Sequence, residues 1–171
     1  PRIVEYTLTE KELGMWCGGA VTVLLEPLGP GVTLWIFGYG NLGREVHGLV
    51  ESLLFKPVVL HEEELSDVNS RVIDWASLEP FPDVGPDDFV LVLTMDADVE
   101  LEILSRLSSV KPRFLGVIGS KRKGKKLISL LKERGAQPET MDIRIPVGLD
   151  IGARNPKEIA ISIVAELIGK R

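Results

Sequence analysis

The sequence is poor in the residues that form disulfides and metal sites. It contains one cysteine, Cys17, and two histidines, His47 and His61. A single cysteine excludes an internal disulfide, and these three residues do not have the spacing of a zinc site. No apolar stretch approaches the roughly 20 residues that a membrane-spanning helix needs, and residues 1–12 are polar and show no secretory signal pattern. We therefore expect a cytoplasmic protein that does not associate with a membrane.

Positive charge is scarce as well. The 20 lysines and arginines are outnumbered by 25 acids, which gives a net charge of −5. This balance disfavours non-specific binding of nucleic acid. A length of 171 residues, with 44% hydrophobic and 26% charged residues, is typical of a soluble globular domain with a small extension.

One glycine-rich stretch organises the rest of the chain. An apolar run, Thr33–Phe37, leads into a G-x-G-x-x-G motif, and an amphipathic helical pattern follows at once. The motif consists of Gly38, Tyr39, Gly40, Asn41, Leu42 and Gly43. In a dinucleotide-binding unit the first glycine allows a tight turn, the second lets a pyrophosphate approach the backbone, and the third lets the helix pack on the strand. The alternative is a glycine-rich turn without a ligand.

Strand and helix patterns alternate after this motif. Strands are expected at Thr33–Phe37, Pro57–His61, Val72–Ile73, Asp88–Thr94 and Phe114–Ile118. The alternation predicts an α/β fold, a Rossmann-like doubly wound parallel sheet, over residues 31–171. Residues 1–30 are expected to form a small β-extension, a hairpin of two strands that ends at the breaker Gly29-Pro30-Gly31.

Two helices have clear patterns of their own. The helix expected over Asn41–Leu54 would bury the stripe Leu42, Val46, Leu49, Val50 and Leu53 and leave His47 partly exposed. The last helix should begin at Pro156, with Asn155 as its cap and Glu158 completing a capping box. Residues 144–152, ahead of it, have no strand or helix period and are expected to form a loop.

Two further segments are candidates for holding a nucleotide. Glu62 follows the second expected strand, 19 residues beyond Gly43, where an acid would accept hydrogen bonds from ribose hydroxyls. The alternative is a solvated acidic loop. Gly119-Ser120-Lys121-Arg122 opens a helix, and cations in a first turn oppose the helix dipole unless an anion is bound there. That segment is a second phosphate candidate, and its alternative is a basic surface face.

Two isolated residues complete the candidates. Cys17 lies in C-G-G, where glycine neighbours expose a thiol that a soft metal can bind. Asp150 lies between two glycines and is placed to bind an amine or hydroxyl of a ligand. Each has a plain alternative, as a turn residue and as a cap of its own loop. The sequence shows no Ser-His-Asp arrangement and no general base for hydride transfer, so a non-enzymatic role is favoured.

Five segments in this order resemble one known family. They are Cys17-Gly18-Gly19, the glycine motif, residues 116–123, residues 146–153 and residues 155–166. Together they resemble the XdhC/CoxI family, accessory proteins of xanthine dehydrogenase and related molybdenum hydroxylases. The similarity covers the Rossmann-type C-terminal domain of that family and, over residues 3–28, the tail of its N-terminal domain.

The resemblance implies a chaperone that binds molybdenum cofactor (molybdopterin), protects it during sulfuration by a cysteine desulfurase, and passes it to a molybdenum hydroxylase. A homodimer is left open, and so are the alternatives of an NAD(P)-dependent oxidoreductase and a nucleotide-sensing module. The candidate cofactor-binding residues are Gly38, Tyr39, Gly40, Asn41, Leu42, Gly43, Glu62, Gly119, Ser120, Lys121, Arg122 and Asp150, and the candidate metal ligand is Cys17.

The sequence departs from the family pattern at three places. The acids at the end of the second strand, often D-D-R, are replaced by His61-Glu62-Glu63. The turn often written T-H-D-H is here Thr94-Met95-Asp96-Ala97, without histidine. Asn41 stands where the glycine motif of the family has a histidine. These departures concern the residues that would distinguish one ligand from another.

Overall fold

The computed structural model describes residues 2–7, 19–25 and 31–171, which divide into two compact units, Pro1–Gly31 and Val32–Arg171. The first unit contains an antiparallel hairpin of β1 (Arg2–Thr7) and β2 (Ala20–Leu25). Arg2 pairs with Leu25 and Thr7 pairs with Ala20. The hairpin expected from the sequence is therefore confirmed. Cys17, the candidate metal ligand, lies outside the described residues.

The second unit is built on a parallel sheet of six strands in the order β5-β4-β3-β6-β7-β8. The strands are β3 (Val32–Phe37), β4 (Phe55–His61), β5 (Ser70–Val72), β6 (Phe89–Val92), β7 (Phe114–Val117) and β8 (Ile143–Arg144). The chain builds outward from β3 in one direction, returns, and builds outward from β6 in the other. This reversal beside the first strand is the order of the doubly wound dinucleotide-binding fold, so the Rossmann-like prediction is confirmed.

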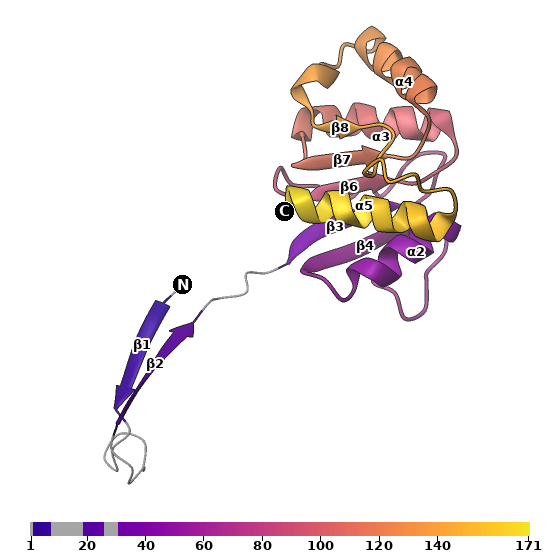
Figure 1. Ribbon diagram of the computed structural model, residues 1–171. Coiled ribbons are helices and arrows are strands. Elements are labelled where there is room, and N and C mark those ends of the chain that lie inside the picture. Colours follow the sequence, from indigo (N-terminus) through magenta and orange to yellow (C-terminus); the bar gives the residue numbers. More distant parts are fainter. Residues whose placement is uncertain (1, 8–18, 26–30) are drawn as a thin grey trace. The chain divides into compact units, whose positions relative to one another are not determined.

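Helices cover both faces of the sheet. Side by side on one face lie α2 (Asn41–Val50) and α5 (Pro156–Lys170), and on the other lie α3 (Ala97–Val110) and α4 (Lys121–Glu133) (Figure 1). A short 3-10 helix, η1 (Pro138–Thr140), precedes β8. Right-handed crossovers that run in opposite directions from the centre of a sheet place their helices on opposite faces, and this produces the two layers.

The central strands are buried on both sides. All four residues of β6 are buried, as are the four of β7. Phe37, Phe89 and Phe114 are completely inaccessible to solvent. This burial explains why the sequence shows continuous apolar runs here rather than alternation. Within the described residues, no helix is long and apolar enough to cross a membrane.

The sequence missed the last strand of the sheet. β8 is only two residues long and pairs in parallel with β7, with Ile143 opposite Leu115 and Arg144 opposite Gly116. A strand this short shows no alternation of apolar and polar residues, so the sequence predicted a loop over the whole of residues 144–152. The strand has a consequence for the site, because it fixes where that loop begins.

The buried stripe predicted for α2 is confirmed at Val46 and Val50 but wrong at Leu49, and His47 takes a buried position that was not predicted for it. His47 is only 4% exposed, whereas Leu49 is 38% exposed. The helix ends at Val50 rather than Leu54, and its buried residues include Gly43, Val46, His47 and Val50. The imidazole is covered because the Tyr39 ring packs edge-on against it, with ring centroids 5.7 Å apart. The expectation of a partly exposed histidine was wrong.

Candidate functional site

Two glycines of the motif are required by the turn itself. Gly38 has a φ of +103°, and a side chain there would lie 3.2 Å from the carbonyl carbon of Leu93. At Gly43 a Cβ would overlap the carbonyl oxygen of Gly38. Only glycine suits both positions, because the first needs the left-handed backbone and the second a very close approach. These are the two structural roles expected from the sequence.

Gly40 is different, because the fold itself leaves its side-chain position empty. A Cβ at Gly40 would meet no atom within 4 Å, and its φ of −70° suits any residue. Gly40 is also the N-cap of α2, and no side chain caps this helix. By contrast Asp96, Ser120 and Asn155 cap α3, α4 and α5 with their side chains. The first amides of α2 are thus the ones that remain available to an external acceptor.

A cavity opens in front of this turn, at the carboxyl ends of β3, β4 and β6. We name it the glycine-turn cavity. It has a volume of about 350 Å³ and is lined by Gly38, Tyr39, Gly40, His61, Glu62, Trp75, Leu93, Thr94, Met95, Asp96 and Val99. It lies where the strand order reverses, which is where open α/β sheets bind their ligands. Glu62, the predicted ribose acceptor, is part of its wall.

Aromatic side chains shape one side of the glycine-turn cavity. The Tyr39 ring lies edge-on to the His61 ring, with centroids 6.4 Å apart. The Arg44 guanidinium lies over the Tyr39 ring, 5.3 Å from its centroid. The Met95 side chain is 91% exposed beside them. The wall is therefore a mixture of ring faces, one thioether and the Glu62 carboxylate.

The opposite wall belongs to the connection between β5 and β6, which contains Trp75. Arg106 of α3 holds this connection: Nη1 lies 2.8 Å from Glu79 Oε1, and Nη2 donates to Ser77 O at 2.9 Å. The amide of Ala76 and the hydroxyl of Ser77 donate to Asp74 and lower the pKa of that carboxyl. These bonds fix a segment that would otherwise be an unsupported loop.

A second cavity lies at the carboxyl ends of β7 and β8. We name it the loop cavity. Its volume is about 500 Å³, and it is lined by Ile118, Gly119, Lys121, residues 146–153, Ile159 and Ser162. The loop is held from α5, since Gly148 N donates to Glu166 Oε2 at 2.7 Å and Leu149 N donates to Ser162 O at 3.2 Å. This anchoring keeps Asp150 at the rim, on the side of the cavity that faces solvent.

The helix that opens at Gly119 contains an ion pair that the sequence did not predict. Ser120 caps α4 as expected, because its hydroxyl accepts from Lys123 N at 3.2 Å. Lys123 Nζ lies 2.5 Å from Oε1 of Glu100, a completely buried acid of α3. Burial raises the pKa of Glu100, and the bond from Lys123 offsets this only in part. Lys123 is therefore used in an ion pair inside the protein, whereas Lys121 lines the loop cavity.

The predicted residues thus divide between two cavities. Gly38, Tyr39, Gly40 and Glu62 line the glycine-turn cavity, and Gly119, Lys121 and Asp150 line the loop cavity. The two sets have no residue in common. Asn41, Leu42 and Gly43 form the first turn of α2, and Arg122 is exposed on α4 and lines neither cavity.

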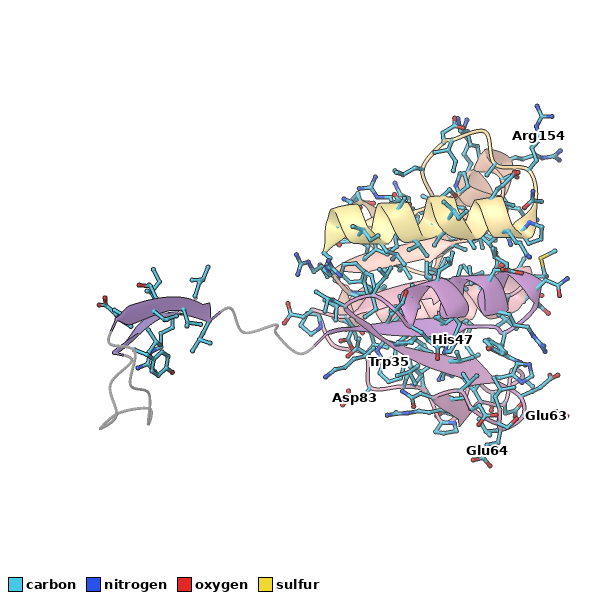
Figure 2. All side chains as sticks on the ribbon, turned by 60° about the horizontal axis from the view of Figure 1, so that its bottom comes forward. Trp35, His47, Glu63, Glu64, Asp83 and Arg154 are labelled. Atoms are coloured by element: carbon cyan, nitrogen blue, oxygen red, sulfur yellow. The ribbon has the colours of Figure 1, made fainter. Side chains whose placement is uncertain are left out.

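Both cavities lie at the end of the sheet where the strands have their carboxyl ends. Figure 2 shows Arg154, ahead of α5, at the same end of this unit as Glu63 and Glu64, and Asp83 at the opposite end. Among the described residues, no group of three or more histidine, cysteine, aspartate or glutamate side chains is arranged to hold a metal ion. The two cavities therefore offer amides, the carboxylates of Glu62, Asp96 and Asp150, and the ammonium group of Lys121, the groups that bind phosphates and hydroxyls.

Known proteins of similar sequence also contain a Rossmann domain. The sequence model of the XdhC Rossmann domain matches residues 34–167. The chain is 31% identical over 166 residues to the uncharacterized protein YqeB of Escherichia coli. This alignment covers 91% of this chain and 30% of that protein. It is 32% identical over 104 residues to the molybdenum cofactor insertion chaperone PaoD of Escherichia coli. This alignment covers 60% of this chain and 33% of that protein.

Two Bacillus proteins are also similar. A probable xanthine dehydrogenase subunit of Bacillus subtilis is 37% identical over 86 residues, covering 50% of this chain and 24% of that protein. A Bacillus halodurans crystal structure, described as a xanthine dehydrogenase, superposes with a TM-score of 0.69 at 33% identity, covering 82% of this chain and 43% of that one. The chain spans at most about a third of the curated relatives it matches. Through its Rossmann domain, the chain belongs to the XdhC family.

Proposed function

We propose that this chain binds molybdenum cofactor at the carboxyl edge of its sheet, as part of an accessory protein that prepares the cofactor for a molybdenum hydroxylase of the xanthine dehydrogenase type. The family supports this proposal, and so does the relative PaoD, whose name describes insertion of molybdenum cofactor. A cysteine desulfurase as sulfur donor remains a prediction from the family resemblance, and a homodimeric assembly is left open.

The observation that carries the proposal is the empty space at Gly40 beside the uncapped start of α2. Within the part of the chain that the structure describes, no atom lies within 4 Å of a Cβ built at Gly40, and no side chain caps the first turn of α2. A phosphate fits such a position, because it accepts from backbone N–H groups and is favoured by the helix dipole. Glu62 is close enough to share the same cavity and to accept from a hydroxyl next to that phosphate.

The remainder of the ligand has a place in the loop cavity. Molybdopterin carries a phosphate at one end of a polar pterin, and a dinucleotide form extends it. Lys121 offers a positive charge and Asp150 an acceptor for an amine or hydroxyl. The residues present therefore fit a long polar ligand with a phosphate near its middle or end. When bound, the cofactor supplies the molybdenum centre, and the chain's own residues bind it and orient it.

An NAD(P)-dependent oxidoreductase is the second candidate, because the strand order and the glycine turn serve nicotinamide dinucleotides equally well. The sequence shows no general base for hydride transfer that would favour it. A nucleotide-sensing module would use the same turn without any chemistry. Cys17 as a ligand at the metal end stays a prediction, since that residue lies outside the described part of the chain.

Calorimetric titration with molybdopterin, NAD and NADP separates these functions. We expect molybdopterin to bind most tightly. Gly40→Val fills the phosphate space and should abolish this binding while the melting temperature changes little, because a Cβ at this position would meet no atom of the described residues within 4 Å. Gly48→Val is the matched control: it makes the same change in α2 where the space is equally open, away from both cavities. Tighter binding of NAD, or unchanged binding by the Gly40 variant, would contradict the proposal.

A further inference from the structure

A third hollow lies on the outer edge of the sheet, between α4 and β8. We name it the basic groove. Its volume is about 520 Å³, and it is lined by Lys121, Gly124, Lys125, Ile128, Ile143, Ile145 and Pro146. Only Lys121 and Pro146 also line the loop cavity. The remaining residues play no part in the cofactor site described above, so the groove needs an explanation of its own.

One face of α4 forms the first wall of the groove. Lys121, Gly124, Lys125 and Ile128 follow one another at helical spacing and therefore lie on a single face. Gly124 brings the helix close to the strand: a Cβ there would lie 3.0 Å from Cβ of Ile145. Helix and strand therefore meet at this point, and the groove runs along the line where they meet.

The edge of the sheet forms the second wall. β8 is the last strand in the sheet order. Its inner side is occupied, because Asp142 O accepts from Leu115 N at 3.3 Å. Alternate residues of a strand turn their backbone groups to opposite sides, so the N–H and C=O groups of Ile143 point outward. Ile143 in β8 and Ile145, just beyond the end of this strand, both pack against the core beside α4. The groove thus combines an apolar floor with a strand edge that is open to pairing.

The charge of the groove is positive and is not neutralised by the groove's own acids. Five of the six residues from Lys121 to Lys126 are basic, but Lys123 pairs with Glu100. Within the described residues, no acidic side chain lies within ion-pair distance of Lys121 or Lys125, whereas Lys132 further along α4 pairs with Glu139 at 3.5 Å. In a chain with a net charge of −5, this is a local concentration of positive charge above an apolar surface.

We propose that the basic groove is a docking site for an extended, acidic segment of another protein. The segment adds a strand beside β8, its carboxylates pair with Lys121 and Lys125, and its alternate apolar side chains cover Ile128, Ile143 and Ile145. Addition of a strand to an open sheet edge supplies backbone hydrogen bonds, and the flanking pockets and charges select the sequence. A single-stranded nucleic acid fits less well, because no aromatic side chain lines the groove to stack its bases.

Designed peptides test the chemistry of the groove directly. Three short fluorescein-labelled probes alternate Glu with Leu, Glu with Ser, and Lys with Leu, and fluorescence anisotropy measures their binding to the purified chain. We expect the Glu–Leu probe to bind most tightly. Lys125→Glu should weaken it about tenfold, since it replaces an attraction by a repulsion near a partly desolvated surface. Lys126→Glu is the matched control, because Lys126 is equally exposed on α4 but does not line the groove.

Nuclear magnetic resonance locates the bound probe. Shifts of amide signals from Gly124, Ile128, Ile143 and Ile145 on addition of the Glu–Leu probe would support docking in the groove. The proposal is overturned if no probe binds at millimolar concentration, if Lys126→Glu weakens binding as much as Lys125→Glu, or if the shifts lie elsewhere. It is also overturned if the Glu–Ser probe or a short single-stranded oligonucleotide binds more tightly than the Glu–Leu probe. Each result is independent of cofactor binding, because none of these variants changes a residue of the glycine-turn cavity.

Discussion

The two halves of the sheet differ in how their helices begin. In the half that contains β3, α2 begins at Gly40 with no side-chain cap and no acid in its first turn. In the half that contains β7, α4 begins with a Ser120 cap and has Lys121 in its first turn. The first half offers backbone amides and empty space, and the second offers a side-chain charge. Equivalent positions in one fold thus acquire different chemistry from a few residues.

The largest effect should come from the glycines that the backbone geometry requires. Gly43→Val places a side chain on the Gly38 carbonyl oxygen, and we expect it to lower the free energy of unfolding by about 2–4 kcal/mol. Gly40→Val should change it by much less, because the space there is empty. Urea denaturation of the two variants measures the difference. Equal stability would show that the turn adapts and that Gly40 and Gly43 do not have distinct roles.

The second half contains a matching position. Gly148 has a φ of +103°, and a Cβ there would collide with the hydroxyl of Ser162. Gly148→Ala should therefore also destabilise, by about 1–3 kcal/mol from backbone strain and crowding, and urea denaturation measures the loss. If Gly43→Val lowered the stability but Gly148→Ala did not, the backbone conformation of Gly148 would not matter to the loop. The hydrogen bonds to α5 would then be what holds this loop.

An intermediate effect is expected from the two candidate carboxylates, Glu62 in the glycine-turn cavity and Asp150 in the loop cavity. Glu62→Gln should weaken a dinucleotide form of the cofactor about tenfold or more, because a hydrogen bond to a charged group contributes about 1.5–3 kcal/mol. Molybdopterin without the nucleotide should lose little. Asp150→Asn should weaken both forms to a similar degree if the loop cavity holds the pterin. Calorimetry with the two forms measures this, and equal losses for both ligands in the Glu62 variant would remove Glu62 from the ribose site.

The smallest effect concerns the ion pair between α3 and α4. Burial raises the pKa of Glu100 above its ordinary value of 4.5, so the folded state holds this proton more tightly than the unfolded state. The free energy of unfolding should then fall as the pH rises from about 4.5 through the raised pKa. Glu100→Gln cannot titrate and should lack this decline. Urea denaturation across that pH range measures the slope, with Asp98→Asn as the control for loss of one exposed acid from the same helix. An unchanged slope would show that Lys123 compensates the buried charge fully.

Local patterns predicted the parts of the molecule that depend on local geometry. The turn at Gly38, the fold class and the start of α5 are of this kind. At α5, Asn155 accepts from Glu158 N at 3.0 Å, and Arg154 N donates to Glu158 Oε2 at 2.7 Å. The Asn155 cap expected from the sequence is therefore confirmed, whereas Glu158 accepts from the amide of Arg154, one residue before the cap, instead of from the amide of Asn155 itself. Each of these features is decided within a few residues of the chain.

Features that depend on packing between distant segments escaped prediction. The Glu100–Lys123 pair joins residues 23 positions apart and exists only because α3 and α4 are neighbours. His47 is buried because Tyr39 covers it, and no helical period shows that. The division of the candidate residues between two cavities follows from how the 146–153 loop is tied to α5. The binding roles of these residues stay predictions.

The position of Trp75 has an optical consequence. Its indole lines the glycine-turn cavity, whereas the indole of Trp35 is 5% exposed and donates to Asp88 Oδ2 at 2.9 Å, at the other end of the sheet. A molecule that enters the cavity must change the polarity around the first ring and leave the second unchanged. In a variant that keeps only Trp75, the wavelength and intensity of tryptophan emission therefore become a direct signal of occupancy, without any label attached to the protein or to its ligand.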